Sequence, residues 1–331
     1  MAIIRSSFFA LFSAVSLHHK SAATAMNTSS SSVRVIDRVI DSHLHVWASK
    51  EETTGFPYAE GQDPPESLAS AASTTQLLKR MDESGVSGAL IVQPINHKFD
   101  HSYLIDAIKR HPNRFKGMLL HDPSLTEDQA VSRLEDLVLN GFVGVRFNPY
   151  LWNKTGDKTW EPMSVGAGLA TYKRCAELRM PVGVMCFQGL DLHYDDILNL
   201  LQASPQTKMI LDHFAFTSLT EKGNESFQKL LDLAKYPQVY VKVSALFRQG
   251  DVAPYERVKL ERLDPLLQAF GSDRLLFGTD FPFVLEQNEQ YKGTVGLVSS
   301  WLAEDEKGRA AVMGGTAERL FGPWGIKKDE L

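Results

Sequence analysis

Two histidines, His43 and His45, stand two residues apart at the end of the apolar stretch in "IDSHLHVW" (40–47). Side chains two apart in a strand project to the same face, so both imidazoles face one way if Leu44 faces the other. Asp41 is expected on that same face, one step deeper, as an acceptor that orients an imidazole. Paired imidazoles hold a divalent metal or polarise a substrate carbonyl. The plainer alternative is a pair of hydrogen-bonded core histidines.

Asp280 is the second reactive candidate, in the segment "FGTDFPF" (277–283) near the other end of the chain. A carboxylate beside two imidazoles can take a proton from water as a general base and return it to the leaving group. The alternative is an aspartate that caps the turn after this segment. Hydrolytic chemistry therefore requires a fold that brings residue 280 next to residues 43 and 45.

Eight short apolar stretches alternate with longer segments of helical periodicity from residue 33 onward. In the helical segment 126–141, Thr126 is the expected N-cap and Gly141 stands at the expected end. This alternation predicts parallel strands, and eight units predict an α/β fold of one domain, a TIM-like (β/α)8 barrel. A doubly wound sheet is the rival, but its first turn is normally Gly-rich, and "DSHLHVW" contains no glycine. The expected strands lie within 33–45, 86–94, 114–123, 142–149, 181–188, 208–214, 239–245 and 274–282.

The carboxyl ends of these strands carry polar residues, and that end of a barrel holds the active site. His213 in "MILDHF" (209–214) is predicted as a third metal ligand or a neutral hydrogen-bond donor, with Asp212 on the opposite face toward the helices. Arg146 lies within an apolar strand, where it pairs with a barrel carboxylate or, as we favour, binds a carboxylate of the substrate. Further candidate substrate contacts are Trp47, Gln93, His121, Asn148 and Gln188.

The composition favours an enzyme that acts on a small molecule. The formal net charge is −5 without a long run of either sign, which argues against nucleic acid or an anionic membrane as a partner. No apolar stretch is long enough to cross a bilayer. Cys175 and Cys186 are predicted as buried thiols rather than as a disulfide or a reactive pair. The composition is also compatible with a homo-oligomer.

The two ends of the chain resemble targeting signals. Residues 1–32 contain no Asp or Glu and nine Ser, as in organellar transit peptides, and we favour the chloroplast. The C-terminal sequence Lys328-Asp329-Glu330-Leu331 is an ER-retention signal, which makes the ER lumen the alternative, and a start at Met26 would give a cytosolic form. The predicted organisation is a targeting segment at 1–32, a barrel domain at 33–322 and a tail at 323–331.

The motifs "DSHLHVW", "GALIVQP", "GVRFNP", "LDHF" and "LLFGTDFP" together resemble the amidohydrolase-related (amidohydrolase 2) family of the amidohydrolase superfamily, from about Val35 to Phe321. Within it the chain is similar to the branch of 2-pyrone-4,6-dicarboxylate hydrolases and sugar or muconolactone lactonases. The resemblance implies hydrolysis of a lactone with an anionic group. Asp280 would activate water, while His43, His45 and His213 would polarise the carbonyl or, with Asp280, bind one divalent cation (Zn or Mn). Metal-free catalysis is the alternative.

Two departures from the family pattern narrow this expectation. Strand five ends at Gln188, where two-metal members have a ligand histidine, so a two-metal site is not expected. The segment "FAFT" (214–217) replaces an arginine-bearing turn, which argues against a dicarboxylate pyrone as substrate.

Two other functions are compatible with the same residues. A metal-dependent decarboxylase of the aminocarboxymuconate-semialdehyde type shares much of this framework and would release carbon dioxide rather than acid. A barrel that binds a metabolite without converting it would keep its ligand affinity in Asp280→Asn and would show no turnover of lactones.

Overall fold

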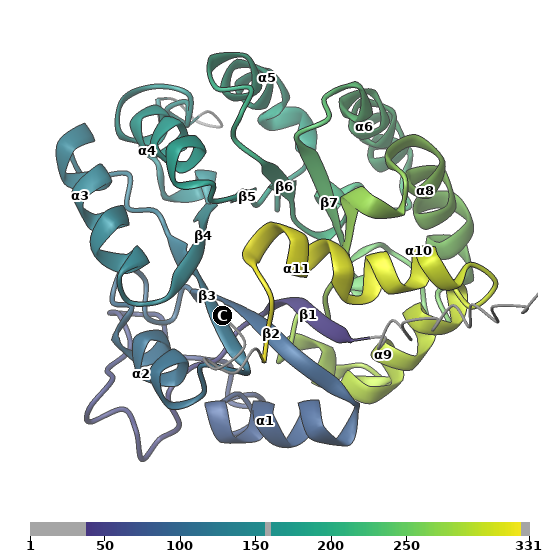
Figure 1. The fold of residues 1–331 in the computed structure, drawn as a ribbon, viewed down its shortest axis with the longest axis horizontal. Coiled ribbons are helices and arrows are strands. Elements are labelled where there is room, and N and C mark those ends of the chain that lie inside the picture. Colours follow the sequence, from purple (N-terminus) through teal and green to yellow (C-terminus); the bar gives the residue numbers. More distant parts are fainter. Residues whose placement is uncertain (1–37, 156–159, 326–331) are drawn as a thin grey trace, which may run out of the picture. The chain divides into compact units, whose positions relative to one another are not determined.

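The computed structural model describes residues 38–155 and 160–325, which form the predicted barrel of eight parallel strands (Figure 1). The strands follow one another around the barrel in chain order. The ring closes between β1 and β8, where Leu44 bridges Phe281 and the backbone N–H of Asp280 donates to the carbonyl oxygen of His43 over 2.9 Å. The strands are β1 Val39–Leu44, β2 Val86–Val92, β3 Phe115–Leu120, β4 Phe142–Phe147, β5 Val182–Val184, β6 Met209–Leu211, β7 Val239–Val243 and β8 Leu275–Phe277.

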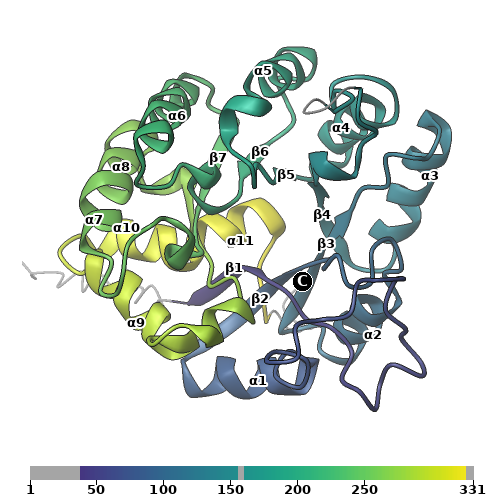
Figure 2. The same cartoon turned by 180° about the vertical axis from the view of Figure 1, so that it is seen from behind.

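Helices surround the strands and cover their outer faces (Figures 1 and 2). The predicted helix at 126–141 is α3, and its N-cap is a capping box in which Thr126 and Gln129 each accept the other's backbone N–H. Gly141 follows the end of this helix with φ of 93°, a conformation that L side chains rarely adopt. The helices are α1 Thr74–Glu83, α2 Ser102–Arg110, α3 Glu127–Val138, α4 Gly166–Leu178, α5 Tyr194–Ala203, α6 Glu221–Asp232, α7 Glu256–Val258, α8 Asp264–Phe270, α9 Gln290–Trp301, α10 Glu306–Ala310 and α11 Thr316–Phe321.

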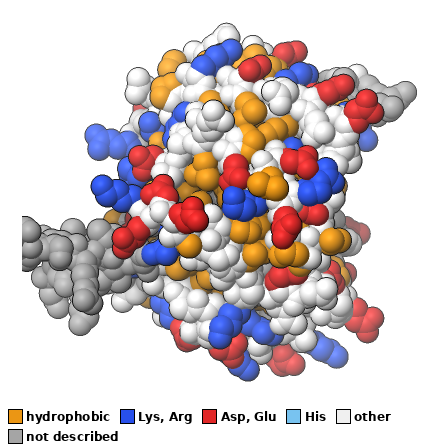
Figure 3. Space-filling model, turned by 90° about the vertical axis from the view of Figure 1, so that its right-hand side faces the viewer, with side chains coloured by type: hydrophobic (Ala, Val, Ile, Leu, Met, Phe, Trp, Pro, Cys, Tyr) orange, Lys and Arg blue, Asp and Glu red, His pale blue; other side chains and the backbone are white. Residues whose placement is uncertain are grey.

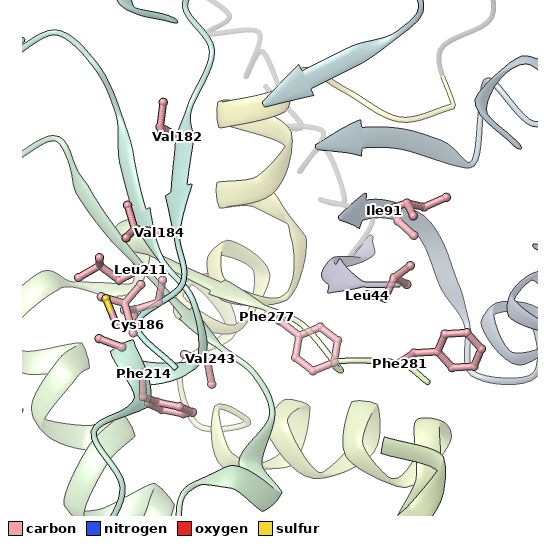
Figure 4. Close-up of a cluster of buried hydrophobic side chains, with 14 of the residues drawn as sticks. Leu44, Ile91, Val182, Val184, Cys186, Leu211, Phe214, Val243, Phe277 and Phe281 are labelled. Carbon is pink, nitrogen blue, oxygen red and sulfur yellow. The ribbon is translucent and has the colours of Figure 1, made fainter. Parts of the chain in front are cut away.

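The main hydrophobic core lies between the strands and the helices. Outward-facing strand residues such as Leu44, Leu211 and Phe277 are fully buried there (Figure 4). Burial of one such side chain stabilises the fold by about 1.5–3 kcal/mol. Cys175 and Cys186 are free and buried in the same layer, as predicted.

A second apolar cluster fills the barrel interior at the amino ends of the strands. It is capped by α11 (Figure 1) and by Trp324, whose side chain is 1% exposed. A Cβ on Gly88 would lie 2.4 Å from the Trp324 ring, so only glycine lets the indole pack this closely. The predicted tail at 323–331 therefore includes a core residue, Trp324. The cluster consists of Ile40, Leu90, Val92, Met118, Ile210, Tyr240, Leu276, Ala317, Phe321 and Trp324.

The surface carries charges of both signs. On the face shown in Figure 3, Lys and Arg side chains lie among Asp and Glu side chains, with hydrophobic ones between them. Among the described residues, no helix is long and apolar enough to cross a membrane. The predicted targeting segment at 1–32 and the C-terminal tetrapeptide at 328–331 lie outside the described residues.

Candidate active site

A cavity of about 360 Å³ opens at the carboxyl ends of the strands. Its floor is polar, because His45, His213 and Asp280 reach it, and two arginines stand at its sides. Its walls are mostly apolar. The lining residues are His45, Trp47, Pro94, Ile95, Asn96, Arg146, Asn148, Met185, Phe187, His213, Phe216, Arg248, Asp280 and Phe283.

Three imidazoles surround one carboxylate oxygen of Asp280, those of His45 and His213 at the floor and that of His43 buried beneath it. The distances from Asp280 Oδ1 to the Nε2 atoms are 4.0 Å for His43, 3.7 Å for His45 and 3.8 Å for His213. All four side chains are at least 90% buried. Residues from the two ends of the barrel domain therefore meet at one point, as the sequence predicts.

A bulge in β1 directs its two histidines into the barrel. Asp41 pairs with Ala89 and Leu44 with Ile91, so three steps along β1 oppose two along β2. The extra residue reverses the alternation, because a bulge places two residues opposite one. Ile40 and His43 consequently both lie inside the barrel, while Leu44 packs in the outer core.

The prediction for Asp41 is wrong for the same reason. Its carboxylate accepts from the backbone N–H and the hydroxyl of Thr279 (3.0 and 2.6 Å) and from the backbone N–H of His43 (3.1 Å). It also raises the pKa of Tyr291 on α9, after the larger effect of burial. Asp41 thus joins β1 to the segment that follows β8, and it does not orient an imidazole.

A left-handed turn after β6 places His213 in the site. His213, Phe214, Ala215 and Phe216 have φ values between 52° and 56°. Each such residue costs roughly 1–2 kcal/mol, and strain of this kind clusters at functional sites. The hydroxyl of Ser244 lies 2.7 Å from His213 Nδ1 and orients the ring.

The turn also explains why the prediction for Asp212 is wrong. The alternation of β6 places the residue that follows it, Asp212, on the inner face with Ile210, and His213 would face outward if the strand continued. Because β6 ends at Leu211 and the chain then turns, both Asp212 and His213 reach the site. Asp212 is fully buried inside the barrel, not directed toward the helices.

A buried network lies beneath the three imidazoles. Asp212 Oδ1 is 3.2 Å from His43 Nδ1 and 3.2 Å from Lys242 Nζ, and its Oδ2 accepts from Arg146 Nε over 3.1 Å. Lys242 Nζ also lies 3.0 Å from His43 Nδ1. Arg146 therefore forms the ion pair that was the less favoured of its two predicted roles, and it lines the cavity as well.

Sequence reasoning missed Lys242 and Arg248. Lys242 lies in the apolar strand "VYVKVSA" (239–245), where alternation places it on the inner face with Tyr240. A lysine at such a position could have been predicted from the sequence as a residue of the site. Arg248 lies in the turn after β7, and its Nε donates to Asp280 Oδ2 over 3.0 Å. A loop arginine carries no comparable periodic signal.

Burial and neighbouring charges set the protonation of the site. Burial raises the pKa of Asp280 to about 6, against the opposing effect of Arg248. Burial, followed by the charge of Arg146, lowers the pKa of His45 to about 3. Burial also holds the pKa values of His43 and His213 well below the ordinary value. All three imidazoles are therefore neutral near pH 7.

Asp212 has the opposite shift to Asp280. Burial would raise its pKa, but the charges of Lys242 and Arg146 hold that pKa well below the ordinary value. Asp212 is therefore an ionised structural partner, while Asp280 is poised to exchange a proton.

Two of the five further predicted substrate contacts line the cavity. Trp47 forms part of its wall, and Asn148 lies at its edge while accepting from the backbone N–H of Tyr150.

The other three predicted contacts lie away from the cavity. Gln93 donates to the carbonyls of Lys98 and Asp100, and His121 stacks on Trp152 with ring centroids 5.2 Å apart. Gln188 is exposed. Gln93 and His121 follow the inward-facing residues Val92 and Met118 by one and three residues, which are odd numbers. Alternation therefore directs these side chains away from the cavity.

The predicted metal site fits a cation by spacing but not by surroundings. Donor atoms of His43, His45 and Asp280 lie within 4.8 Å of one another. His45 has the usual partner of a metal-binding imidazole, because its Nδ1 faces the carbonyl oxygen of Val92 at 2.8 Å. His43 instead has an ammonium group 3.0 Å from Nδ1, and Asp280 already binds a guanidinium. These cations disfavour a further positive charge between the same ligands.

Comparison with known proteins identifies the family. Residues 40–322 match the amidohydrolase family model. The 4-sulfomuconolactone hydrolase of Rhizobium radiobacter is 28% identical over 262 residues, which are 73% of this chain and 75% of that protein. The L-fucono-1,5-lactonase of Burkholderia ambifaria is 25% identical over 306 residues, which are 85% of this chain and 94% of that protein.

Solved structures share the barrel. The crystal structure of a "probable 2-pyrone-4,6-dicarboxylic acid hydrolase" from Acinetobacter baumannii, with citric acid bound, has a TM-score of 0.69 at 19% identity and covers 86% of this chain and 99% of that one. An amidohydrolase of Burkholderia multivorans with bound zinc has a TM-score of 0.66 at 20% identity, with coverage of 86% and 99%. These likenesses concern the fold, whereas the family model matches the sequence over most of its length. The chain therefore belongs to the amidohydrolase family and is a hydrolase.

Proposed function

We propose that the protein hydrolyses a lactone that carries an anionic group. The observation that carries this proposal is the buried Asp280 carboxylate, with three neutral imidazoles at 3.7–4.0 Å from one of its oxygens. A carboxyl with a pKa of about 6 can take a proton from water and return it near neutral pH. Neutral imidazoles can hydrogen-bond a carbonyl without adding charge.

The reaction follows from these groups. Asp280 takes a proton from a water molecule while the oxygen of that water attacks the lactone carbonyl carbon. Imidazole N–H groups stabilise the negative carbonyl oxygen of the tetrahedral intermediate. The intermediate collapses by breaking the bond to the ring oxygen, and the proton on Asp280 passes to that oxygen. One water is consumed, and the product is a hydroxy acid.

The charge of the site supports an anionic substrate. Arg146, Lys242 and Arg248 are three cations, against two carboxylates, Asp212 and Asp280, so the cluster has one more cation than anions. Both arginines line the cavity and use Nε on a carboxylate. A guanidinium has five N–H donors, which leaves others to bind a substrate carboxylate or sulfonate.

A lactone panel tests the proposal. The purified protein is assayed for acid release on 4-sulfomuconolactone, L-fucono-1,5-lactone, 2-pyrone-4,6-dicarboxylate and an uncharged five-membered lactone, with carbon dioxide measured in parallel. We expect acid release on an anionic lactone and a higher kcat/KM there than on the uncharged one. Carbon dioxide release without hydrolysis would contradict the proposal and favour the decarboxylase. Ligand binding without turnover would contradict it as well.

A further inference from the structure

Two opposite charges face the same ring nitrogen of His43. Lys242 Nζ is 3.0 Å from Nδ1, and Asp212 Oδ1 is 3.2 Å from it. All three side chains are fully buried. The ammonium group has only N–H donors, so it favours a lone pair on Nδ1, whereas the carboxylate favours a proton there. One neutral ring can satisfy only one of them.

The neighbouring contacts decide between the two arrangements. Asp212 already accepts from Lys242 at 3.2 Å and from Arg146 at 3.1 Å, so each of its oxygens has a cationic donor. Lys242 lies near two acceptors within the described residues, Asp212 Oδ1 and His43 Nδ1. A buried donor of a charged group costs free energy when it is left unsatisfied, whereas each Asp212 oxygen keeps a cationic donor in either arrangement. The balance places the lone pair on Nδ1 and the proton on Nε2.

His45 has the opposite arrangement. Its Nδ1 lies 2.8 Å from the carbonyl oxygen of Val92, and a carbonyl only accepts. The proton of the neutral His45 ring is therefore on Nδ1, and its Nε2 carries a lone pair. The two histidines of one His-x-His motif thus direct a donor and an acceptor at the same Asp280 oxygen.

We propose that Lys242 is a positioning residue that holds His43 with its proton on Nε2, so that His43 donates a hydrogen bond at the reaction centre and cannot bind a metal there. This inference rests on the proposed function for its catalytic meaning. His43 Nε2 is buried and has no hydrogen-bond partner among the described residues, which leaves its N–H for the carbonyl oxygen that becomes negative. His45 Nε2 accepts from the water that Asp280 deprotonates. With a proton on Nε2, His43 has no lone pair there for a metal ion, and this would explain why the predicted metal site does not suit a cation.

Nitrogen-15 NMR of the histidine rings tests the tautomer directly. The protein is labelled with ¹⁵N-histidine, and the His43 signals are assigned by their loss in His43→Gln. We expect Nε2 of His43 to be protonated and Nδ1 to be unprotonated, with the reverse in His45. A protonated Nδ1 in His43 would overturn the proposal. This result does not depend on turnover, so it is separate from any failure of the lactone assays.

Removal of the ammonium group gives a second test. In Lys242→Met, we expect the His43 proton to move to Nδ1 and donate to Asp212, which frees Nε2 to bind a metal. Zinc affinity, measured by equilibrium dialysis with elemental analysis, should rise by about 10–100-fold, the usual size of an effect on the partner of a ligand. The value of kcat should fall about 10²-fold, the usual loss of one oxyanion donor.

Lys116→Met is the matched control. Lys116 is a lysine of β3 whose Nζ donates to the carbonyl of Phe321 at the opposite end of the barrel. We expect this variant to keep the parental tautomer and zinc affinity. Folded Lys242→Met with unchanged zinc affinity and an unchanged His43 tautomer would refute the role of Lys242.

Discussion

The two ends of the barrel interior are built from the same strands with opposite chemistry. On β7 the inward residues are Tyr240 at the amino end and Lys242 at the carboxyl end. The corresponding residues of the next strand are Ile210 within β6 and Asp212 directly after it. The amino end packs apolar side chains against Trp324, whereas the carboxyl end holds charges, a bulge and left-handed turns. Only the amino end consists of closely packed apolar side chains, as a stable core does. The difference predicts that substitutions at one end change stability and at the other end change activity.

The largest effect is expected for Asp280→Asn, which should remove most of the activity at the carboxyl end of the barrel. An amide cannot accept the proton of water, so kcat should fall by about 10²–10⁴-fold. Steady-state kinetics on the best lactone measures this loss, with Asp63→Asn, an exposed aspartate in the loop after β1, as the control. Near-parental activity in Asp280→Asn would remove the carboxylate from its role.

Trp324→Ala should destabilise the apolar cluster at the amino end of the barrel. Truncation of a buried tryptophan costs about 3–5 kcal/mol, so urea unfolding should show that loss. The value of kcat at low temperature should stay within about twofold, because the indole lies at the opposite end of the barrel. Trp301→Ala on α9, where the side chain is only partly buried, is the control and should lose less. An equal loss in both variants would contradict the packing role of Trp324.

The pH dependence adds to the comparison of the two barrel ends, because the raised pKa of Asp280 serves catalysis and lowers the stability of the fold. Burial raises the pKa of Asp280 to about 6, and the base acts when ionised. We expect kcat/KM to rise about tenfold per pH unit below about pH 6 and to level off above it. Initial rates between about pH 4.5 and 8 measure this profile. A flat profile down to pH 4.5 would exclude Asp280 as the titrating base.

The same pKa has the opposite consequence for stability. A rise from 3.8 to about 6 favours the protonated form in the folded chain, so this contribution is complete below about pH 4 and is lost as the pH rises to about 6. It corresponds to about 3 kcal/mol. Asp280→Asn does not titrate, so its free energy of unfolding should exceed that of the parent by more at pH 7.5 than at pH 4.

Gly88→Ala should have the smallest effect. The added Cβ would lie 2.4 Å from the Trp324 ring, and overpacking of this kind costs about 1–3 kcal/mol. Thermal unfolding measures the loss. The control is Gly296→Ala on α9, where the added Cβ meets nothing within 4 Å and the helix should gain slightly. A stabilised Gly88→Ala variant would show that the Trp324 packing can adjust.

The sequence by itself determined the barrel, its eight strands and the meeting of His43, His45 and Asp280. Each of these follows from a local period or from chain order, because strands one and eight must be neighbours in a closed barrel. The same reasoning could have found Lys242, which interrupts an apolar strand in the way that Arg146 does.

Only the tertiary structure decided where Asp41 lies and that His213 joins Asp212 inside the barrel. Alternation holds within a regular strand, but the bulge in β1 depends on its pairing with β2, and the left-handed turn at His213 depends on where β6 stops pairing. The proton position on His43 depends on Lys242, which is 199 residues away in the chain. Long-range contacts set these features, and no local pattern records such contacts.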